Sequence, residues 1–317
     1  MLFDNIKNVP IIYTSSFFRN NYTNINLKFM KMNRFITISI LILLSAQLTG
    51  RNFEEGLLWK VSGNDLQQPS FVFGTLHVIC PDEFVVFPGI EQSLDASERI
   101  VLELDISNPE IIMGMQMGMI MRDEKKLPGI LSEEDFALVS NFFKDSLGMN
   151  ISMVERVQPF FLVSIILPHM IQCLPQSYEG FFIEKANKHE LELIGLETLQ
   201  EQLDVFDALT YEEQAGMLLE VLRDYEVKRE EFRHMLDLYL SQDIKALERL
   251  FDELESQFDE FNRRLLMDRN HRWIERMETL MQEKATFFAV GAGHLPGEHG
   301  VLKLLADKGY TIERVVK

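Results

Sequence analysis

The sequence predicts an α/β fold, with a central mixed, mostly parallel sheet, flanking helices and a helical cap. Short apolar segments alternate with longer segments of helical periodicity, a pattern typical of strands joined through crossover helices. Two apolar segments near opposite ends of the domain run into the same turn, Gly-x-x-His, and resemble pseudo-symmetric strand-turn units. A chain of 317 residues with 46% hydrophobic content can bury the core of such a fold.

Six segments are predicted as strands because they are short, apolar and rich in β-branched or aromatic residues. They are residues 57–61, 70–73, 99–104, 192–196, 286–290 and 310–316. In open α/β sheets, ligands bind beyond the carboxyl ends of the strands. The residues that follow these segments are therefore the first candidates for a functional site.

The stretch from Thr210 to Lys284 is predicted to be almost wholly helical, with a break and a new helix start at Ser241-Gln242-Asp243. Capping boxes are expected at Ser132 and Thr210, where a hydroxyl is followed three residues later by an acid. Two or three long helices in this stretch would form a cap or side layer on the sheet.

The N-terminal residues are predicted to lie outside the domain. Residues 1–29 are polar and asparagine-rich and suggest an over-extended start, with Met30 or Met32 as the natural one. Residues 30–47 have the basic start, ten-residue apolar run and small residues of a secretory signal peptide; an uncleaved anchor is the alternative. The domain would then cover residues 48–317, in a periplasmic or secreted protein with no stable membrane span after cleavage.

The formal charge of −18 disfavours nucleic-acid binding, because an acidic surface repels phosphate backbones. The two cysteines, Cys80 and Cys173, match no metal motif. In an exported protein they could form one disulfide, and two buried free thiols are the other possibility.

The two turns of the form Gly-x-x-His are the strongest candidates for chemistry. Gly74-Thr75-Leu76-His77 follows residues 71–73, and Gly291-Ala292-Gly293-His294 follows residues 287–290. A histidine just past a strand end is presented at the rim of the sheet, where imidazole can bind a divalent metal or transfer a proton. Each histidine alone could be an ordinary turn residue, but we expect the two to share one site.

Acidic and polar candidates follow other segments of the sheet. Glu103 and Asp105 are two apart, so a strand would place both on one face; Glu103 is expected to bind metal or act as a base, whereas a cap suits Asp105 better. Glu197 is a weaker candidate of the same kind. Arg269 and Asn270, in a predicted helix, could hold an oxyanion, although a charged helix face is the simpler interpretation.

Methionine occupies every second position from Met113 to Met121, with two glycines between. The simplest interpretation is a pliable helix packed on the core. A substrate-facing groove and a soft-metal site for copper are the alternatives.

Taken together, these motifs resemble the TraB/PrgY/gumN family, which includes the animal Tiki proteases. The resemblance covers residues 56–317 and rests on Gly74–His77, Val101–Asp105, Ser177–Glu179, Gly195–Thr198, Arg269-Asn270 and Val290–Gly297. It implies an α/β domain with internal pseudo-symmetry and, for the Tiki branch, a metal-dependent protease that requires both histidine motifs.

The resemblance also implies roles for single residues. His77 and His294 would be metal ligands, Glu103 their acidic partner, and Arg269 and Asn270 would complete the pocket. The residues after Glu179 depart from the Gly-x-Asp-like element of other branches, which leaves the role of Glu179 open.

The resulting prediction is an exported metal-dependent hydrolase acting on peptides. A Mn²⁺, Co²⁺ or Zn²⁺ ion at His77 and His294 would activate water, with Glu103 as ligand or base and with Arg269 and Asn270 stabilising the oxyanion. The chief alternative is a non-catalytic protein that sequesters a peptide or small ligand in the same cleft, with the methionine-rich segment as one wall. Haem binding through the histidines is a further alternative that rests on fold analogy.

Overall fold

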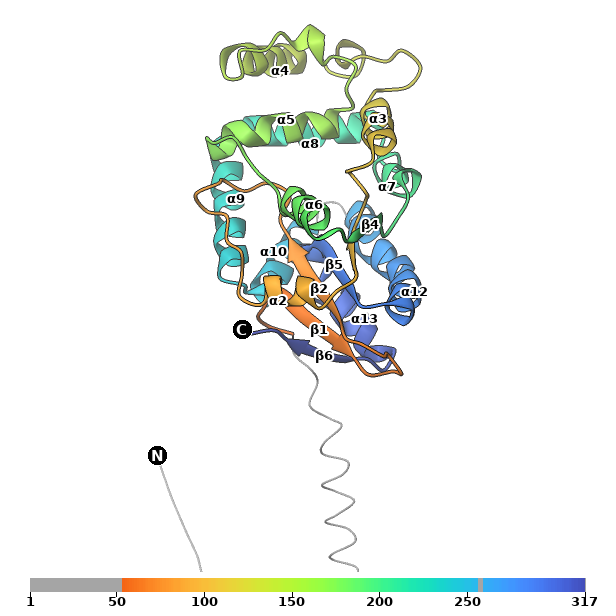
Figure 1. Ribbon diagram of the computed structural model, residues 1–317. Helices are drawn as coiled ribbons and strands as arrows, with labels where there is room; N and C mark the ends of the chain where they lie inside the picture. Colours follow the sequence, from red (N-terminus) through yellow and green to blue (C-terminus); the bar gives the residue numbers. More distant parts are fainter. Residues whose placement is uncertain (1–52, 256–258, 317) are drawn as a thin grey trace, which may run out of the picture. The chain divides into compact units, whose positions relative to one another are not determined.

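The computed structural model describes residues 53–255 and 259–316 (Figure 1). The predicted N-terminal segment and signal peptide lie outside the described residues. Within the part described, no helix has the length and apolar character needed to cross a bilayer.

Six strands form one sheet in the order β4-β3-β5-β2-β1-β6. They are β1 (Leu58–Ser62), β2 (Ser70–Thr75), β3 (Arg99–Leu102), β4 (Glu192–Gly195), β5 (Thr286–Gly291) and β6 (Thr311–Arg314). The pairs β2–β5, β3–β5 and β3–β4 are parallel, whereas β1 is antiparallel to β2 and β6. The mixed, mostly parallel sheet is confirmed, and each predicted segment contributes a strand.

The central strands β2 and β5 explain why the two histidine turns meet. Both are almost wholly buried and apolar, as expected of strands covered on two faces. They lie side by side with Phe71 opposite Phe287 and Gly74 opposite Val290. The two turn glycines are thus staggered by one residue, and both turns leave the same edge of the sheet.

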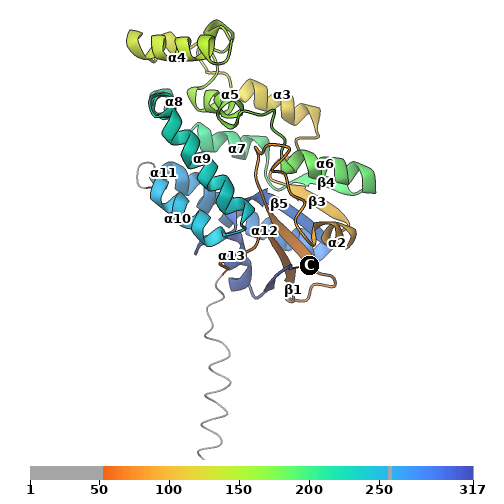
Figure 2. The ribbon, with the colours of Figure 1, turned by 90° about the vertical axis from the view of Figure 1, so that its left-hand side faces the viewer.

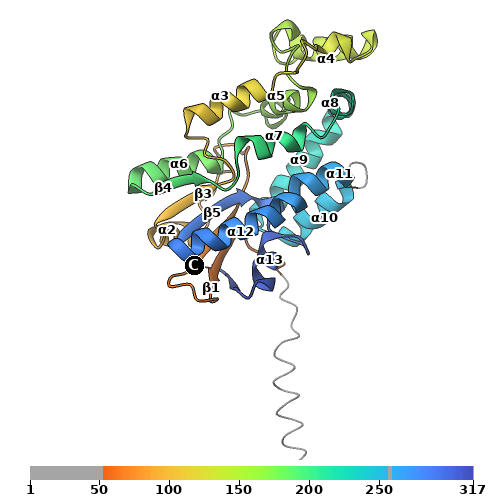
Figure 3. The same ribbon diagram turned by 90° about the vertical axis from the view of Figure 1, so that its right-hand side faces the viewer.

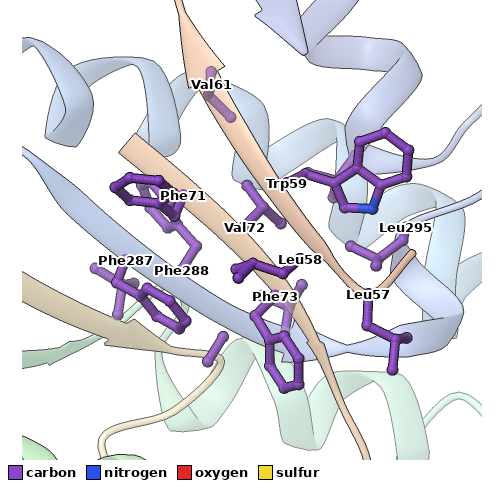
Figure 4. Packing of buried hydrophobic residues seen from close by; sticks show 14 of the residues in the cluster. Leu57, Leu58, Trp59, Val61, Phe71, Val72, Phe73, Phe287, Phe288 and Leu295 are labelled. Carbon is purple, nitrogen blue, oxygen red and sulfur yellow. The ribbon is translucent and has the colours of Figure 1, made fainter. Parts of the chain in front are cut away.

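The main core lies on both faces of these strands. Figure 4 shows the side chains of β1, β2 and β5 packed with Leu295, which follows the second histidine turn. Helices α2 (Ile90–Asp95) and α6 (Tyr178–His189) lie on one side of the sheet, and α12 (Asp268–Glu283) and α13 (Val301–Asp307) on the other (Figures 2 and 3).

A layer of helices lies beyond the carboxyl ends of the parallel strands (Figure 1). It contains α3 (Pro109–Gly118), α4 (Glu133–Asp145), α5 (Pro159–Ile171), α7 (Leu199–Phe206), α8 (Tyr211–Arg223) and α9 (Tyr225–Leu240). Residues of α4, α5 and α8 form a second core, separate from that of the sheet. The helical cap is therefore a structural layer with apolar packing of its own.

The predicted break in the helical stretch is confirmed, because α9 ends at Leu240 and α10 (Ile244–Glu255) begins after it. The stretch continues through α11 (Asp259–Asn262) and a π-helical turn, Arg263–Met267, directly into α12. Its described part holds four helices of 12 or more residues, so the prediction of two or three was too low. Of these, α12 packs on the sheet rather than in the cap.

The interpretation of the methionine-rich helix as packed on the core is wrong. Helix α3 buries no residue, and Met113 and Met117 are 62% and 72% exposed. The helix turns its glycines inward, because a Cβ at Gly114 or Gly118 would lie 2.3 or 2.6 Å from a leucine of α7. With the glycine side against α7, Met113 and Met117 face outward, whereas Met121, beyond the end of the helix, is 1% exposed and belongs to the second core.

Cys80 and Cys173 form a disulfide, which settles the question left open by the sequence. The bond joins the segment after His77 to the segment before α6, and the isolated bridge between Ile79 and Gln176 pairs the same two segments. The first histidine turn is therefore tied to the start of α6.

Candidate active site

A cavity of about 370 Å³ lies at the carboxyl ends of β2, β3 and β5. Its lining includes four of the five predicted site residues, namely His77, Glu103, Arg269 and His294. Asn270, the fifth, is buried directly behind His294. Both histidines therefore line the same cavity.

His294 is held in one orientation and one tautomer. Asn270 donates its amide hydrogens to the carbonyl oxygens of His299 and His294, at 2.8 and 3.4 Å, which fixes Oδ1 as an acceptor. That oxygen lies 2.6 Å from His294 Nδ1, so Nδ1 carries the proton. The lone pair of Nε2 then faces the cavity side, where Arg269 Nη1 approaches to 3.1 Å.

The environment keeps His294 neutral. The residue is 3% exposed, and its ring packs on Trp273 with the ring centroids 4.3 Å apart. Burial lowers the pKa of His294 to about 3, with Glu103 opposing that shift and Arg269 reinforcing it. A neutral imidazole is the form that binds metal, and a metal at Nε2 would have to displace the hydrogen bond from Arg269 Nη1.

His77 has the opposite character. Its side chain is 63% exposed, and Nδ1 lies 3.0 Å from Glu179 Oε1. Desolvation at the cavity wall acts to lower the pKa of His77, but the adjacent Glu179 carboxylate and the more distant Glu103 raise it to about 9. A metal that binds Nε2 of this residue must therefore displace a proton.

Glu103 is buried just past the end of β3, which stops at Leu102. Its Oε1 accepts the backbone N–H of Gly291 at 2.8 Å, and its Oε2 accepts Arg269 Nη2. Burial acts to raise the pKa of Glu103, but Arg269 first, then the histidines and the Gly291 N–H, hold it below its ordinary value. The carboxylate is thus ionised.

Glu103 and Asp105 do not share a strand face, because the strand has already ended. Asp105 accepts hydrogen bonds from the backbone N–H and hydroxyl of Ser107. The helix cap expected of Asp105 is wrong, because the N-cap of α3 is Asn108, whose side chain accepts the backbone N–H of Glu110, and Asp105 closes the turn before it.

Arg269 uses all five of its N–H donors inside the protein. Nε and Nη2 donate to Glu197, Nη2 also to Glu103, and Nη1 to His294 and to the Leu265 carbonyl oxygen. Arg269 is 3% exposed, and although burial acts to lower its pKa, Glu103 and Glu197 raise it. Arg269 is therefore a permanent buried cation.

Two further acids belong to this network: Glu197, which the sequence made only a weak candidate, and Glu179, whose role it left open. Glu197 is fully buried and binds both Arg269 and Trp273 Nε1, the latter at 3.1 Å. Glu179 binds His77, and the motif Ser177-Tyr178-Glu179 was the sequence feature that could have indicated this role. Ser177 caps α6, which places Glu179 in the first turn of that helix.

The residues around Gly291 are of the types that bind a divalent metal. A Cβ at Gly291 would lie 3.2 Å from Glu103 Oε1, 3.6 Å from His294 Cδ2 and 3.8 Å from His77 Nε2. Two donor atoms, Glu103 Oε1 and His77 Nε2, therefore face the point that glycine leaves open, whereas His294 presents a ring carbon there and its Nε2 contacts Arg269 Nη1. Both imidazoles also have Nδ1 held by an oxygen, which is the usual support of metal-binding histidines.

The donor atoms are not drawn tightly together. Among the described residues, the group of three whose ligand atoms all lie within 4.8 Å of one another is Cys80, Asp82 and Glu83, and Cys80 is disulfide-bonded and so offers no thiolate. In the candidate site, His294 Nε2 and Glu103 Oε1 are 3.7 Å apart, and Arg269 contacts both residues. The guanidinium supplies positive charge to these two groups.

The sequence profile of the TraB/PrgY/gumN family matches residues 57–314. The chain is 20% identical to Metalloprotease TIKI2 and to Metalloprotease TIKI1 of Danio rerio, over 81% of this chain and 60% and 62% of theirs. It is 22% identical to Metalloprotease TIKI homolog of Nematostella vectensis, over 84% of this chain and 68% of that protein. The chain thus spans about 60% of the length of the zebrafish proteins. No solved structure matches the chain.

Proposed function

The chain belongs to the TraB/PrgY/gumN family, and we propose that it is an exported metal-dependent hydrolase that acts on peptides. The observation that carries the proposal is that His77, His294 and Glu103 surround the space left open by Gly291. The metalloprotease names of the similar animal proteins support the same reaction class.

The charges of the site support a divalent ion. Glu103, Glu179 and Glu197 are three carboxylates against one guanidinium, so with both imidazoles neutral the cluster has a net charge of −2. A divalent cation would balance that charge, which makes an ion favourable at a buried position. His77, His294 and Glu103 would hold it, and the ion, Mn²⁺, Co²⁺ or Zn²⁺, would polarise a scissile carbonyl and acidify a water molecule.

Glu103 would also accept a proton from that water. A carboxylate whose pKa is lowered is a weak base, and this suits a metal ligand better than a proton acceptor. We therefore assign Glu103 both roles, with metal binding as the main one.

Arg269 and Asn270 are assigned a positioning role in place of the expected oxyanion contact. All donors of Arg269 are engaged within the protein, and both amide hydrogens of Asn270 are engaged by backbone carbonyls. Arg269 would orient Glu103 and His294, and Asn270 would fix the tautomer of His294.

The disulfide supports an oxidising compartment such as the periplasm or the exterior of the cell. The acidic charge remains unfavourable for nucleic acid, so the proposed partners are peptides or small molecules.

Metal analysis combined with a digest of a peptide library tests the proposal. The parent protein should bind Mn²⁺, Co²⁺ or Zn²⁺ and cleave peptides, and a chelator should abolish cleavage. His77→Ala and His294→Ala should each remove metal and activity, whereas Val227→Ala, at an exposed site on α9, should remove neither. Cleavage that persists in both histidine variants would overturn the metal mechanism.

A non-catalytic binding protein is the second candidate, favoured by the apolar walls of the cavity. The methionine-rich segment is not one of those walls, because no residue of α3 lines the cavity, so that part of the prediction is wrong. Ligand binding without turnover at saturating metal would support this candidate over the hydrolase.

A further inference from the structure

The cavity has a polar end, formed by Glu103, Arg269 and the two histidines, and helical walls that are mainly apolar. Helices α5, α7, α9 and α10 and the π-helical turn contribute Phe160, Phe206, Met235, Phe251, Leu265 and Leu266. Every charged side chain among the described lining residues belongs to the cluster around Glu103 and the two histidines. The hydroxyl of Tyr239, which also lines the cavity, is engaged by the Gly74 carbonyl oxygen at 2.9 Å. Gln202 of α7 adds an amide to the lining, and the other side chains of the helical walls are apolar.

These apolar walls begin directly beside the proposed reacting groups. Gly293 precedes His294, and a Cβ at Gly293 would lie 3.1 Å from the ring of Phe251. On the other side, Leu265 and Leu266 stand one helical turn before Arg269 and line the same cavity. A peptide whose carbonyl lies at the histidines would place a neighbouring side chain against these residues.

We infer that the cavity selects peptides with a large apolar or aromatic side chain next to the reacting bond. The inference rests on the proposed hydrolase function and names its substrate class. The volume of about 370 Å³ is near the lower end of the range of about 300–1,000 Å³ typical of ligand sites, enough for a bulky side chain and adjoining backbone. Each buried methylene strengthens binding by about fourfold, whereas an unpaired charge on the same walls is strongly disfavoured.

A set of peptides that differ at one position tests this inference. The variable residue is Phe, Leu, Ala, Lys or Asp between small uncharged neighbours. Calorimetry measures binding to the metal-free full chain, and kcat/KM is measured with the metal-loaded chain. We expect the Phe and Leu peptides to exceed the Ala peptide by at least about tenfold in both measurements, and the Lys and Asp peptides to fall below it.

A matched pair of variants tests the assignment to the cavity. Met235 is a partly buried wall residue on α9, whereas Val227, on the same helix, is 54% exposed and lines no part of the cavity. Met235→Lys should reduce the preference for Phe over Ala by at least about tenfold, and Val227→Lys should leave it unchanged. Thermal unfolding shows whether each variant is folded.

The outcomes separate the two proposals. Turnover with equal rates for all five peptides would overturn the selectivity and leave the hydrolase intact. Selective binding that Met235→Lys weakens, without any turnover, would support the cavity's selectivity and overturn the hydrolase. Selectivity that Met235→Lys leaves unchanged would overturn the assignment to this cavity.

Discussion

The two histidine turns of this protein have the same sequence pattern and opposite physical settings. His294 is buried, neutral and bound to an amide oxygen, whereas His77 is largely exposed, protonated and bound to a carboxylate. The turn of His294 is fixed by a buried polar network, and that of His77 by a disulfide to a neighbouring segment. The pattern Gly-x-x-His therefore sets where the ring stands, and the partner of Nδ1 sets its charge.

In the proposed hydrolase, this difference would suit a site that handles both a metal and a proton. Environments that move two pKa values apart are a general sign of divided roles in catalysis. His294 stays neutral at any ordinary pH, with its Nε2 lone pair directed at Arg269, and His77 has a proton to release. The following experiments test whether the two settings are as unlike as the geometry indicates.

The largest effect is expected from removing the buried cation at the His294 side. Arg269→Met would leave Glu103 and Glu197 as buried carboxylates without a counter-charge, so the free energy of unfolding should fall by about 3–5 kcal/mol. Arg276→Met, in the same helix, removes an arginine that is 40% exposed and should cost at most about 1 kcal/mol. Equal losses in urea unfolding of the two variants would contradict a buried network.

Removal of the disulfide should affect the His77 side next most strongly. The bond closes a loop of 93 residues in sequence separation, and Cys80→Ser combined with Cys173→Ser should lower the free energy of unfolding by about 2–5 kcal/mol. A reducing agent should destabilise the parent equally and leave the double variant unchanged. If reduction has no effect on the parent, the crosslink does not hold this turn.

The histidines themselves should differ in their contribution to folding. His294→Ala removes the ring from Trp273 and leaves Asn270 Oδ1 unpaired, a cost of about 2–3 kcal/mol. His77→Ala truncates a side chain that is 63% exposed and should change the free energy of unfolding by less than about 0.5 kcal/mol. Both variants should lose activity, so similar stabilities would remove the contrast between the turns.

Gly291→Ala should affect function with little effect on folding. Alanine is compatible with the backbone at φ −52° and ψ 137°, but its methyl group would occupy the space between Glu103 and the two histidines. We expect kcat/KM to fall by about tenfold to 100-fold, as a small misplacement of reacting groups can cause. Gly216→Ala, in α8, is the control. A Cβ at Gly216 would meet no atom within 4 Å, so this variant should retain activity.

The smallest effect is a pH dependence of the metal-free protein. In NMR titrations His77 should gain its proton as the pH falls through about 9, whereas His294 should stay neutral until about 3. Because the folded-state pKa of His77 is raised, its ion pair stabilises the fold fully below about pH 6.5 and loses that effect as the pH rises through 9. The contribution should be less than about 1 kcal/mol, since the side chain is largely exposed.

Glu179→Gln should move the pKa of His77 back toward its ordinary value, because the carboxylate is the main group that raises it. A His77 pKa that stays near 9 in this variant would contradict the assignment of Glu179 as its partner.

The sequence was sufficient for features that depend on local chemistry. All six strands, the two histidine turns and the helix break at residues 241–243 follow from apolar runs, glycine and polar breaks. The shared site followed as well, because parallel neighbouring strands end at one edge of the sheet. Register did not follow from the motif alignment, since pairing of β2 with β5 is set by packing and places Gly74 opposite Val290.

Features that depend on distant partners could not be predicted. Glu197 and Arg269 are separated by 72 positions, and nothing local to either residue indicates their ion pair. The orientation of α3 depends on whether α7 approaches its glycines or its methionines, a choice that the periodicity of α3 alone leaves open. In both cases the decisive group lies elsewhere in the chain.

The number of residues in the π-helical turn before α12 determines the direction in which Arg269 points. Successive residues of an α-helix are rotated by about 100° around the axis, so one residue more or fewer in Arg263–Met267 would change the angular phase of everything that follows. Arg269 would leave its two carboxylates, and a neighbour of different charge would face the histidines in its place. The wide turn thus acts as a spacer whose number of residues matters as much as their identity.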